Sequence, residues 1–245
     1  MSTKRAPRKR KESDITDQFK PDYKKNFDCS NITLKKQFPL TDNQTAFYYL
    51  TQNEKTNMIF LDGPAGSAKS YCAVYSGIEM LKSRQVDKIV YIRSVVESSS
   101  KSLGSLPGEI DEKFGPYAAV CIEKAMEIVD KPTLNALLEQ EYIKTIPVNF
   151  VRGLTFNNSF VIIDEAQNLT KGELVTILTR FGRHSKYLIL GDSKQCDITA
   201  SGFNTVFEKF DTDFSRKNHI HTMNFDVSDI VRSPILKHIT QVLGV

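Results

Sequence analysis

A glycine-rich segment near residue 65 has the spacing of a loop that binds phosphate groups. It directly follows an apolar run and opens a helical pattern, which is where such loops occur. Backbone N–H groups of a loop of this kind wrap the phosphates, helped by the positive end of the following helix. We expect Lys69 to reach the β- and γ-phosphates of a nucleotide and the Ser70 hydroxyl to ligate Mg²⁺. The eight expected nucleotide-binding residues are Gly63, Pro64, Ala65, Gly66, Ser67, Ala68, Lys69 and Ser70.

One position of this loop departs from the usual G-x-x-x-x-G-K-[ST] pattern. Ala68 stands where the second glycine is expected. If the backbone there needs a positive φ, alanine costs roughly 1–2 kcal/mol. If φ is negative, the cost is small, because only the left-handed region favours glycine.

Two adjacent carboxylates close an apolar run about a hundred residues further on. The run Phe160–Ile163 is followed by Asp164 and Glu165. We expect Asp164 to hold the magnesium shell and Glu165 to polarise the attacking water. Alone, two acids after a strand indicate only a solvated strand end. Paired with the upstream loop in this order, they predict a site for ATP and Mg²⁺.

A third candidate strand end, Leu190–Gln195, carries the sequence LGDSKQ. Gln195 is expected to sense the γ-phosphate or to orient the attacking water. Glycine, aspartate and serine also favour a plain turn by themselves, and the sequence leaves this alternative open.

These side chains need a framework that brings several strand ends together. The apolar pattern predicts short strands at 58–61, 89–92, 160–163, 187–190 and around 219–225. It predicts helices at 69–82, 109–128, after Pro132, near 171–181, near 203–210 and after Pro234. A break or kink is expected at the Gly115-Pro116 pair. This alternation indicates an α/β fold with a mostly parallel sheet, helices on both faces, and ligands at the carboxyl ends of the strands.

Composition fits a globular domain with a charged tail. The chain of 245 residues is 40% hydrophobic, and no run is long enough to span a membrane. Residues 1–11 hold six basic side chains and no acid, and the rest of the chain has 27 basic and 29 acidic residues. We expect a disordered tail that either binds nucleic acid phosphates or only aids solubility.

Four widely spaced cysteines indicate core thiols and a reducing cytoplasm.

Several ordered segments resemble the PhoH family of P-loop ATPases. The segments are GPAGSAKS, LGSLPGEIDEKFGPY, VRGLTFNNSFVIIDEAQN, LGDSKQCD and DVSDIVRSPILKHI. They extend over roughly residues 40–240. The resemblance implies a RecA-like P-loop NTPase core, similar to superfamily 1 helicases, in the compact form that bacteriophages carry. Residues 1–40 are then a tail and lead-in, and residues 41–245 the ATPase domain.

The resemblance implies roles for three further residues. Gln44 is expected to read adenine, although Thr41 and Gln44 also form a helix-capping pattern. Arg93 is a candidate for contacting a nucleic acid phosphate, although Ser94 replaces the proline that often follows it in the family. Arg232 is a candidate arginine finger for a neighbouring subunit's nucleotide, or else a surface arginine.

The function expected from these features is ATP hydrolysis with Mg²⁺, coupled to RNA or single-stranded DNA. The resemblance implies a helicase-like ATPase, with a homo-oligomer such as a hexameric ring, because one such domain lacks a second core. The expected location is the cytoplasm, which is the host cytoplasm for a phage-encoded protein. The alternative is a nucleotide-gated nucleic-acid-binding protein that turns over negligibly because of Ala68.

Overall fold

Six strands form one parallel sheet in the order β3-β2-β4-β5-β1-β6. The computed structural model describes residues 26–35, 41–94, 110–231 and 233–244, and the side chains of 110–117 fall outside this description. The strands are β1 Met58–Asp62, β2 Lys88–Arg93, β3 Ile143–Pro147, β4 Ser159–Asp164, β5 Lys186–Gly191 and β6 Ile220–Asn224. Their carboxyl ends therefore lie along one edge of the sheet.

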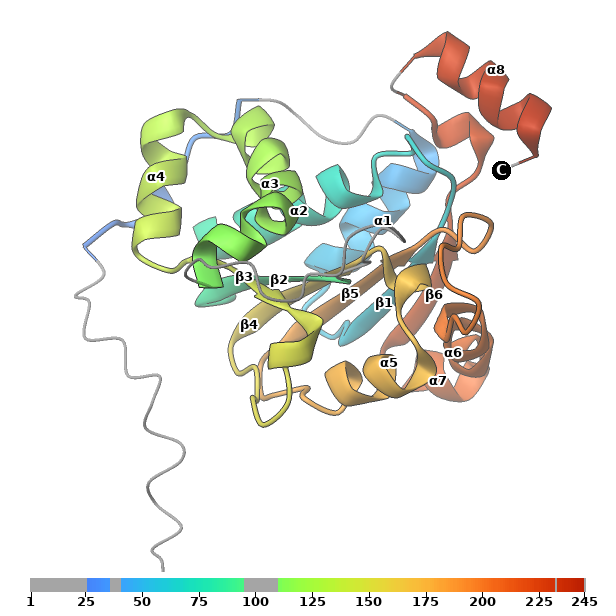
Figure 1. Ribbon diagram of the computed structural model, residues 1–245. Helices are drawn as coiled ribbons and strands as arrows, with labels where there is room; N and C mark the ends of the chain where they lie inside the picture. The colour runs from blue at the N-terminus through green and yellow to red at the C-terminus, as the bar shows by residue number, and fades with distance from the viewer. Residues whose placement is uncertain (1–25, 36–40, 95–109, 232, 245) are drawn as a thin grey trace, which may run out of the picture.

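Alpha-helices connect successive strands of the parallel sheet (Figure 1), except between β3 and β4, where the connection contains only the 3₁₀ turn Val148–Phe150. The helices are α1 Asp42–Gln52, α2 Lys69–Lys82, α3 Ile110–Ile128, α4 Lys131–Glu139, α5 Lys171–Leu178, α6 Phe203–Phe210, α7 Asp213–Lys217 and α8 Pro234–Leu243. Short 3₁₀ turns occur at Cys29–Asn31, Val148–Phe150, Ala166–Asn168 and Val227–Asp229. Side-chain caps start several helices, and Thr170 with Glu173 forms a full capping box at α5.

Helices cover both faces of the sheet, and alternate strand residues point to opposite faces. Ile162 of β4 and Leu188 of β5 belong to a core beneath α1, α2, α3 and α4. Ile163 and Ile189, the next residues along, belong to a second core against α5 and α6. Burial on both faces explains why these strands are continuous apolar runs. The predicted α/β fold, with a parallel sheet and helices on both faces, is confirmed.

The predicted strands and most predicted helices are present, with three differences. Strand β3 was not predicted, because it is a half-buried edge strand with Lys144 and Thr145 in its middle. The five-residue helix α7 was also missed. Of the break or kink predicted at Gly115-Pro116, a break is excluded, since α3 is one element from Ile110 to Ile128. A proline removes one backbone hydrogen bond, and a helix can absorb that loss without ending.

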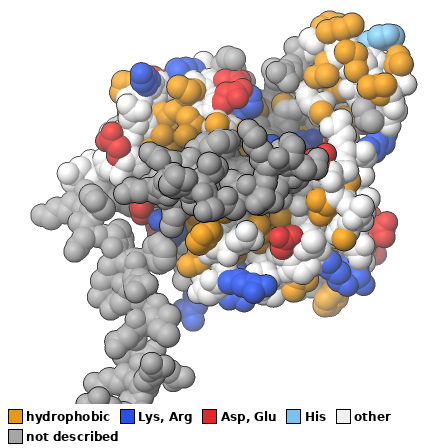
Figure 2. All heavy atoms as spheres, in the orientation of Figure 1, with side chains coloured by type: hydrophobic (Ala, Val, Ile, Leu, Met, Phe, Trp, Pro, Cys, Tyr) orange, Lys and Arg blue, Asp and Glu red, His pale blue; other side chains and the backbone are white. Residues whose placement is uncertain are grey.

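Helix α8 lies apart from the two helical layers, at the end of the chain (Figure 1). Ser233 caps it and Pro234 opens it, so its start is well defined. Leu236 faces the phosphate loop so closely that a Cβ on Gly66 would lie 2.5 Å from its Cδ2 atom. Figure 2 shows hydrophobic side chains exposed on this helix. They include Ile235, Ile239, Val242 and Leu243. Within the described ranges, no helix has both the length and the apolarity to cross a membrane.

Truncation of a sheet residue tests the two-faced core. Ile162 is fully buried in the central strand β4. Ile162→Ala should lower the free energy of unfolding by about 2–5 kcal/mol, because it removes buried methyl groups and leaves a cavity. Val175→Ala on α5, whose side chain is 47% exposed, is the matched control and should change it by less than about 0.5 kcal/mol. Chemical denaturation measures both. Equal losses would contradict this packing.

Candidate nucleotide-binding site

The phosphate loop joins β1 to α2 at the carboxyl edge of the sheet, as the sequence predicts. Gly66 has a φ of +83°, a conformation that a residue without Cβ adopts readily. Ser67 is buried, and its hydroxyl donates a 2.7 Å hydrogen bond to the Pro64 carbonyl. The loop is therefore shaped by its own short-range contacts at the start of α2, where the helix dipole favours anions.

Ala68 occupies the left-handed region, with φ +65° and ψ +21°. Of the two cases that the sequence left open, the costly one applies. An L-residue with a Cβ pays roughly 1–2 kcal/mol there, and the loop retains the conformation nevertheless. The fold as a whole therefore holds the loop in this shape, because the residue itself disfavours it.

Lys69 is half-buried at the end of the loop, and its ammonium donates to the carbonyls of Gly63 and Pro64. Burial lowers its pKa, and the nearby carboxylates of Asp192, Asp164, Glu165 and Asp62 oppose this shift. A polyanionic ligand would stabilise the same ammonium far better than loop carbonyls do. The position and environment of Lys69 are those expected of a phosphate-binding lysine.

The Asp164 carboxylate lies at the end of β4 and accepts hydrogen bonds from three groups. The Ser70 hydroxyl donates to its Oδ2 atom over 2.8 Å, and the Tyr91 hydroxyl donates to the same atom. The backbone N–H of Glu165 donates to Oδ1 over 3.0 Å. Burial, together with the Asp164 charge, raises the pKa of Tyr91 well above its usual range, so Tyr91 remains a hydrogen-bond donor.

A hydroxyl and a carboxylate placed this closely fit a magnesium ion that takes its other ligands from phosphates and water. The buried Asp192 provides a second indication. Its Oδ2 atom is buried without a hydrogen-bond partner among the described residues. An unsatisfied carboxylate oxygen at the same edge of the sheet fits a cation or an ordered water in the cavity.

Glu165 has a φ of +53°, and two side chains hold its carboxylate. Arg93 at the end of β2 lies 3.1 Å from its Oε1 atom. Gln167 donates to Oε2 over 2.6 Å, and its own Oε1 accepts the backbone N–H of Asp192 over 3.0 Å. Two side chains, from the ends of β2 and β4, thus hold the expected general base, and the backbone after β5 positions one of them.

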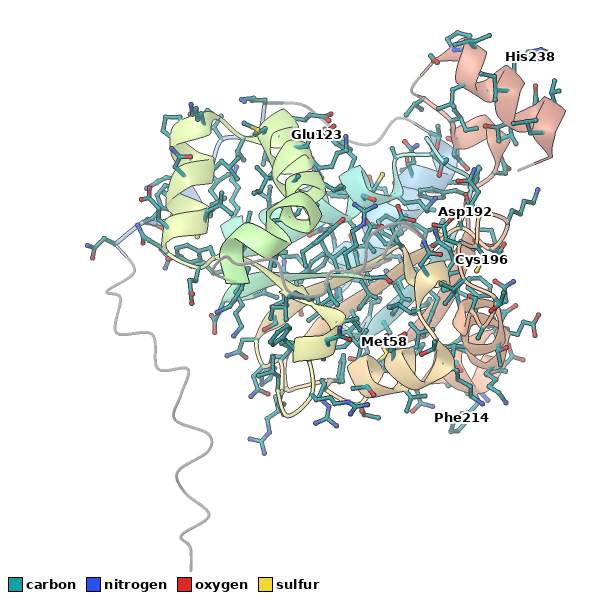
Figure 3. The ribbon with its side chains drawn as sticks, viewed as in Figure 1. Met58, Glu123, Asp192, Cys196, Phe214 and His238 are labelled. Atoms are coloured by element: carbon teal, nitrogen blue, oxygen red, sulfur yellow. The ribbon has the colours of Figure 1, made fainter. Side chains whose placement is uncertain are left out.

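These strand ends border a cavity of about 730 Å³, a size that accommodates a nucleotide. Its phosphate-side lining includes Lys69, Ser70, Asp164, Glu165 and Gln195. Figure 3 marks Asp192 from β5 and Glu123 from α3, which line the same cavity. The structure therefore brings together the residues of all three motifs that the sequence singled out.

One predicted site residue lies in another setting, and another lies outside the described residues. Gln44 is fully buried, and its amide donates to the carbonyls of Ser67 and Asp229 over 3.2 and 3.1 Å. Thr41 caps the N-terminus of α1, as the capping pattern predicts. A contact between Gln44 and adenine stays a prediction. Arg232 lies outside the described residues, as do the basic tail and residues 36–40.

Sequence reasoning missed several residues of the cavity. Asp192 and Gln167 lie in segments that the motifs already covered, so their polar side chains next to strand ends were an available signal. Tyr91 carries no such signal, because it reads as one more apolar residue of β2. The expectation of core thiols holds for Cys29, Cys72 and Cys121, but Cys196 is exposed, because it follows the turn after β5 (Figure 3).

Comparison with known proteins agrees with this arrangement. The profile of a family described as "PhoH-like protein" matches residues 38–244. This chain belongs to the PhoH family. A PhoH-like protein of Bacillus subtilis is 32% identical over 196 residues, covering 79% of this chain and 60% of that protein. Protein PhoH of Escherichia coli K12 is 32% identical over 201 residues, covering 80% and 55%. The chain thus spans a little over half the length of these PhoH relatives.

Among solved structures, the Pif1 helicase of Candida albicans is similar with a TM-score of 0.36 and 15% identity. The match covers 78% of this chain and 40% of that one. A likeness this distant has no bearing on the function of this PhoH family member, which must be inferred from its own site.

Replacement of Ala68 tests the strained loop. Ala68→Gly should raise the free energy of unfolding by about 0.5–1 kcal/mol, because relief of the left-handed strain exceeds the entropy that glycine adds to the unfolded chain. Ala65→Gly is the matched control in the same loop, at a residue whose φ is not positive. It should lower the value by about 0.4–1 kcal/mol. Denaturation curves that shift in the same direction for both variants would contradict the assigned backbone.

Proposed function

We propose that this protein binds ATP with Mg²⁺ in the cavity at the carboxyl edge of the sheet and hydrolyses it. The observation that supports this most is the 2.8 Å contact between Ser70 and Asp164, with Lys69 and Glu165 beside it. A hydroxyl, a carboxylate, a half-buried ammonium and a second carboxylate are the set that phosphoryl transfer to water requires.

Each residue has a distinct part in this proposal. The loop N–H groups and Lys69 bind the phosphate oxygens and stabilise the charge that moves to the leaving group. Ser70 and Asp164 would hold a magnesium ion, which would supply positive charge that neutralises the phosphates. Glu165 accepts the proton of the attacking water. Arg93 and Gln167 hold the Glu165 carboxylate, and Gln195, which follows the neighbouring strand β5, orients the water or the γ-phosphate.

Two substitutions separate binding from hydrolysis. Lys69→Ala should abolish tight ATP binding, because it removes the charge that pairs with the phosphates. Glu165→Gln should bind ATP with an affinity near that of the wild type and lose hydrolysis, because it removes only the proton acceptor. Calorimetry with Mg²⁺ measures the first property and phosphate release the second. If a folded Glu165→Gln protein fails to bind ATP, the assigned role of Glu165 is wrong.

We also propose that hydrolysis is coupled to RNA or single-stranded DNA. Arg93 supports this proposal, because it is a partly exposed cation at the strand-end edge that directly contacts Glu165. A nucleic acid phosphate that pairs with Arg93 would change how the Glu165 carboxylate is held. The alternative, a nucleotide-gated binding protein with negligible turnover, is favoured by the strained Ala68 and the doubly held Glu165.

Phosphate release with and without single-stranded RNA distinguishes these two functions. We expect RNA to stimulate the wild type and Arg93→Ala to lose the stimulation while it retains its ATP affinity. Arg183→Ala is the control, because Arg183 is an exposed arginine that precedes β5, at the opposite edge of the sheet. Negligible turnover in the wild type under all conditions, with ATP bound, would favour the gated binding protein instead.

We further propose an assembly and a location for this protein. A homo-oligomer, up to a hexameric ring, would place the exposed apolar side chains of α8 against a neighbouring subunit. Arg232 directly precedes this helix and is the proposed arginine finger of such an assembly. The cytoplasm, or the host cytoplasm for a phage-encoded protein, is the proposed location.

A further inference from the structure

The nucleotide cavity has a second wall that phosphate and magnesium chemistry does not require. Tyr71 of α2 contributes to this wall, together with the charged residues Glu123, Lys124 and Glu127 of α3. Glu123 points from α3 toward the side of the molecule where α8 lies (Figure 3). A nucleotide anchored by its phosphates at the loop must place its nucleoside against some part of the cavity, and this wall is next to the loop.

Tyr71 offers a flat aromatic surface at a fixed distance from the phosphates. It follows Ser70 directly in the first turn of α2, so its backbone moves with the magnesium-binding hydroxyl. Its ring packs on Tyr75, with centroids 6.2 Å apart, and Tyr75 packs on Tyr48 of α1. Burial and the neighbouring Tyr75 and Glu127 raise the pKa of Tyr71 to about 12. The ring is therefore neutral and held in place, as a stacking surface requires.

The α3 side of the wall presents acceptors in a fixed arrangement. The Lys124 ammonium lies 2.9 Å from one oxygen of Glu123 and 2.9 Å from one oxygen of Glu127. This single cation orients two carboxylates, and a carboxylate has further lone pairs on both of its oxygens. Glu127 and Tyr71 line the same cavity. An acceptor beside a stacking surface selects a planar ligand that has a donor on its edge.

We infer that Tyr71 and the α3 carboxylates, chiefly Glu127, form the nucleobase subsite and select a purine with an exocyclic amino group. This inference rests on the proposed ATP site and specifies its selectivity. The base stacks on Tyr71, and its amino group donates to a carboxylate oxygen. Gln44 is buried against the loop carbonyl of Ser67 and does not line this cavity.

The test compares ATP with purine riboside triphosphate, which lacks only the 6-amino group, by calorimetry with Mg²⁺. The wild type should prefer ATP by about tenfold or more, because a hydrogen bond to a charged group is lost with the analogue. Glu127→Ala should lower the affinity for ATP to that for the analogue. Equal wild-type affinities, or an unchanged preference in both Glu127→Ala and Glu123→Ala, would overturn the inference.

Tyr71 has its own signature in the same assay. Tyr71→Ala should weaken both nucleotides by about tenfold or more, whereas Tyr71→Phe should bind as the wild type does, because stacking needs only the ring. Tyr49→Ala is the control, because Tyr49 belongs to the same aromatic row and is 68% exposed on α1. An unchanged affinity in Tyr71→Ala would overturn the stacking role.

Two further arms separate this inference from its alternatives. One outcome is that 2′-deoxy-ATP binds the wild type more weakly than ATP, while purine riboside triphosphate binds as tightly as ATP. In that case the carboxylates bind the ribose and the base assignment is wrong. A second outcome is that ATP binds the wild type and not Lys69→Ala, while the variants of Tyr71, Glu123 and Glu127 all bind as the wild type does. That result contradicts the nucleobase subsite and leaves the proposed function intact. If ATP does not bind the wild type at all, the proposed function itself falls.

Discussion

The Asp164 carboxylate is the point at which the sheet, the phosphate loop and the cavity are joined. One of its oxygens accepts hydrogen bonds from the hydroxyls of Ser70 on α2 and Tyr91 on β2. The three residues can meet only because β2 and β4 are neighbours in register and α2 covers that face. A buried carboxylate is costly unless donors surround it, so the charge itself favours the arrangement that brings the donors together. The fold and the site therefore share the same contact.

The site residues that could be predicted from the sequence belong to motifs of neighbouring residues in the chain. A glycine-rich loop before a helix and acids after an apolar strand depend on chain neighbours, and a parallel sheet then brings the strand ends together. The remaining contacts link distant parts of the chain. Gln167 accepts the N–H of Asp192, which is 25 residues away, and no local pattern encodes that pairing. Strand β3 was missed for a related reason, because a half-buried edge strand lacks the continuous apolar run of a central strand.

At Gln44 and at Ala68, a local sequence rule determines one property of the residue and the tertiary structure determines another. The capping rule correctly placed the start of α1 at Thr41. It could not tell where the Gln44 side chain goes, since one of its acceptors, the Asp229 carbonyl, is 185 residues further along. At Ala68 the sequence reduced the question to the sign of φ. That sign depends on how β1, the loop and α2 join, so it required the structure.

Leu236 of α8 packs closely against Gly66, so the position of this helix depends on the position of the phosphate loop. A Cβ on Gly66 would lie 2.5 Å from the Cδ2 atom of Leu236, so the loop and the helix pack too closely here for the loop to move toward α8 without displacing it. Seven residues separate Leu236 from Leu243, which is about 10 Å along a helix axis. A tilt of about 10° at the contact then displaces the far end of α8 by about 2 Å. The apolar stripe of this helix would thereby report, at the molecular surface, whether the loop has closed on a phosphate.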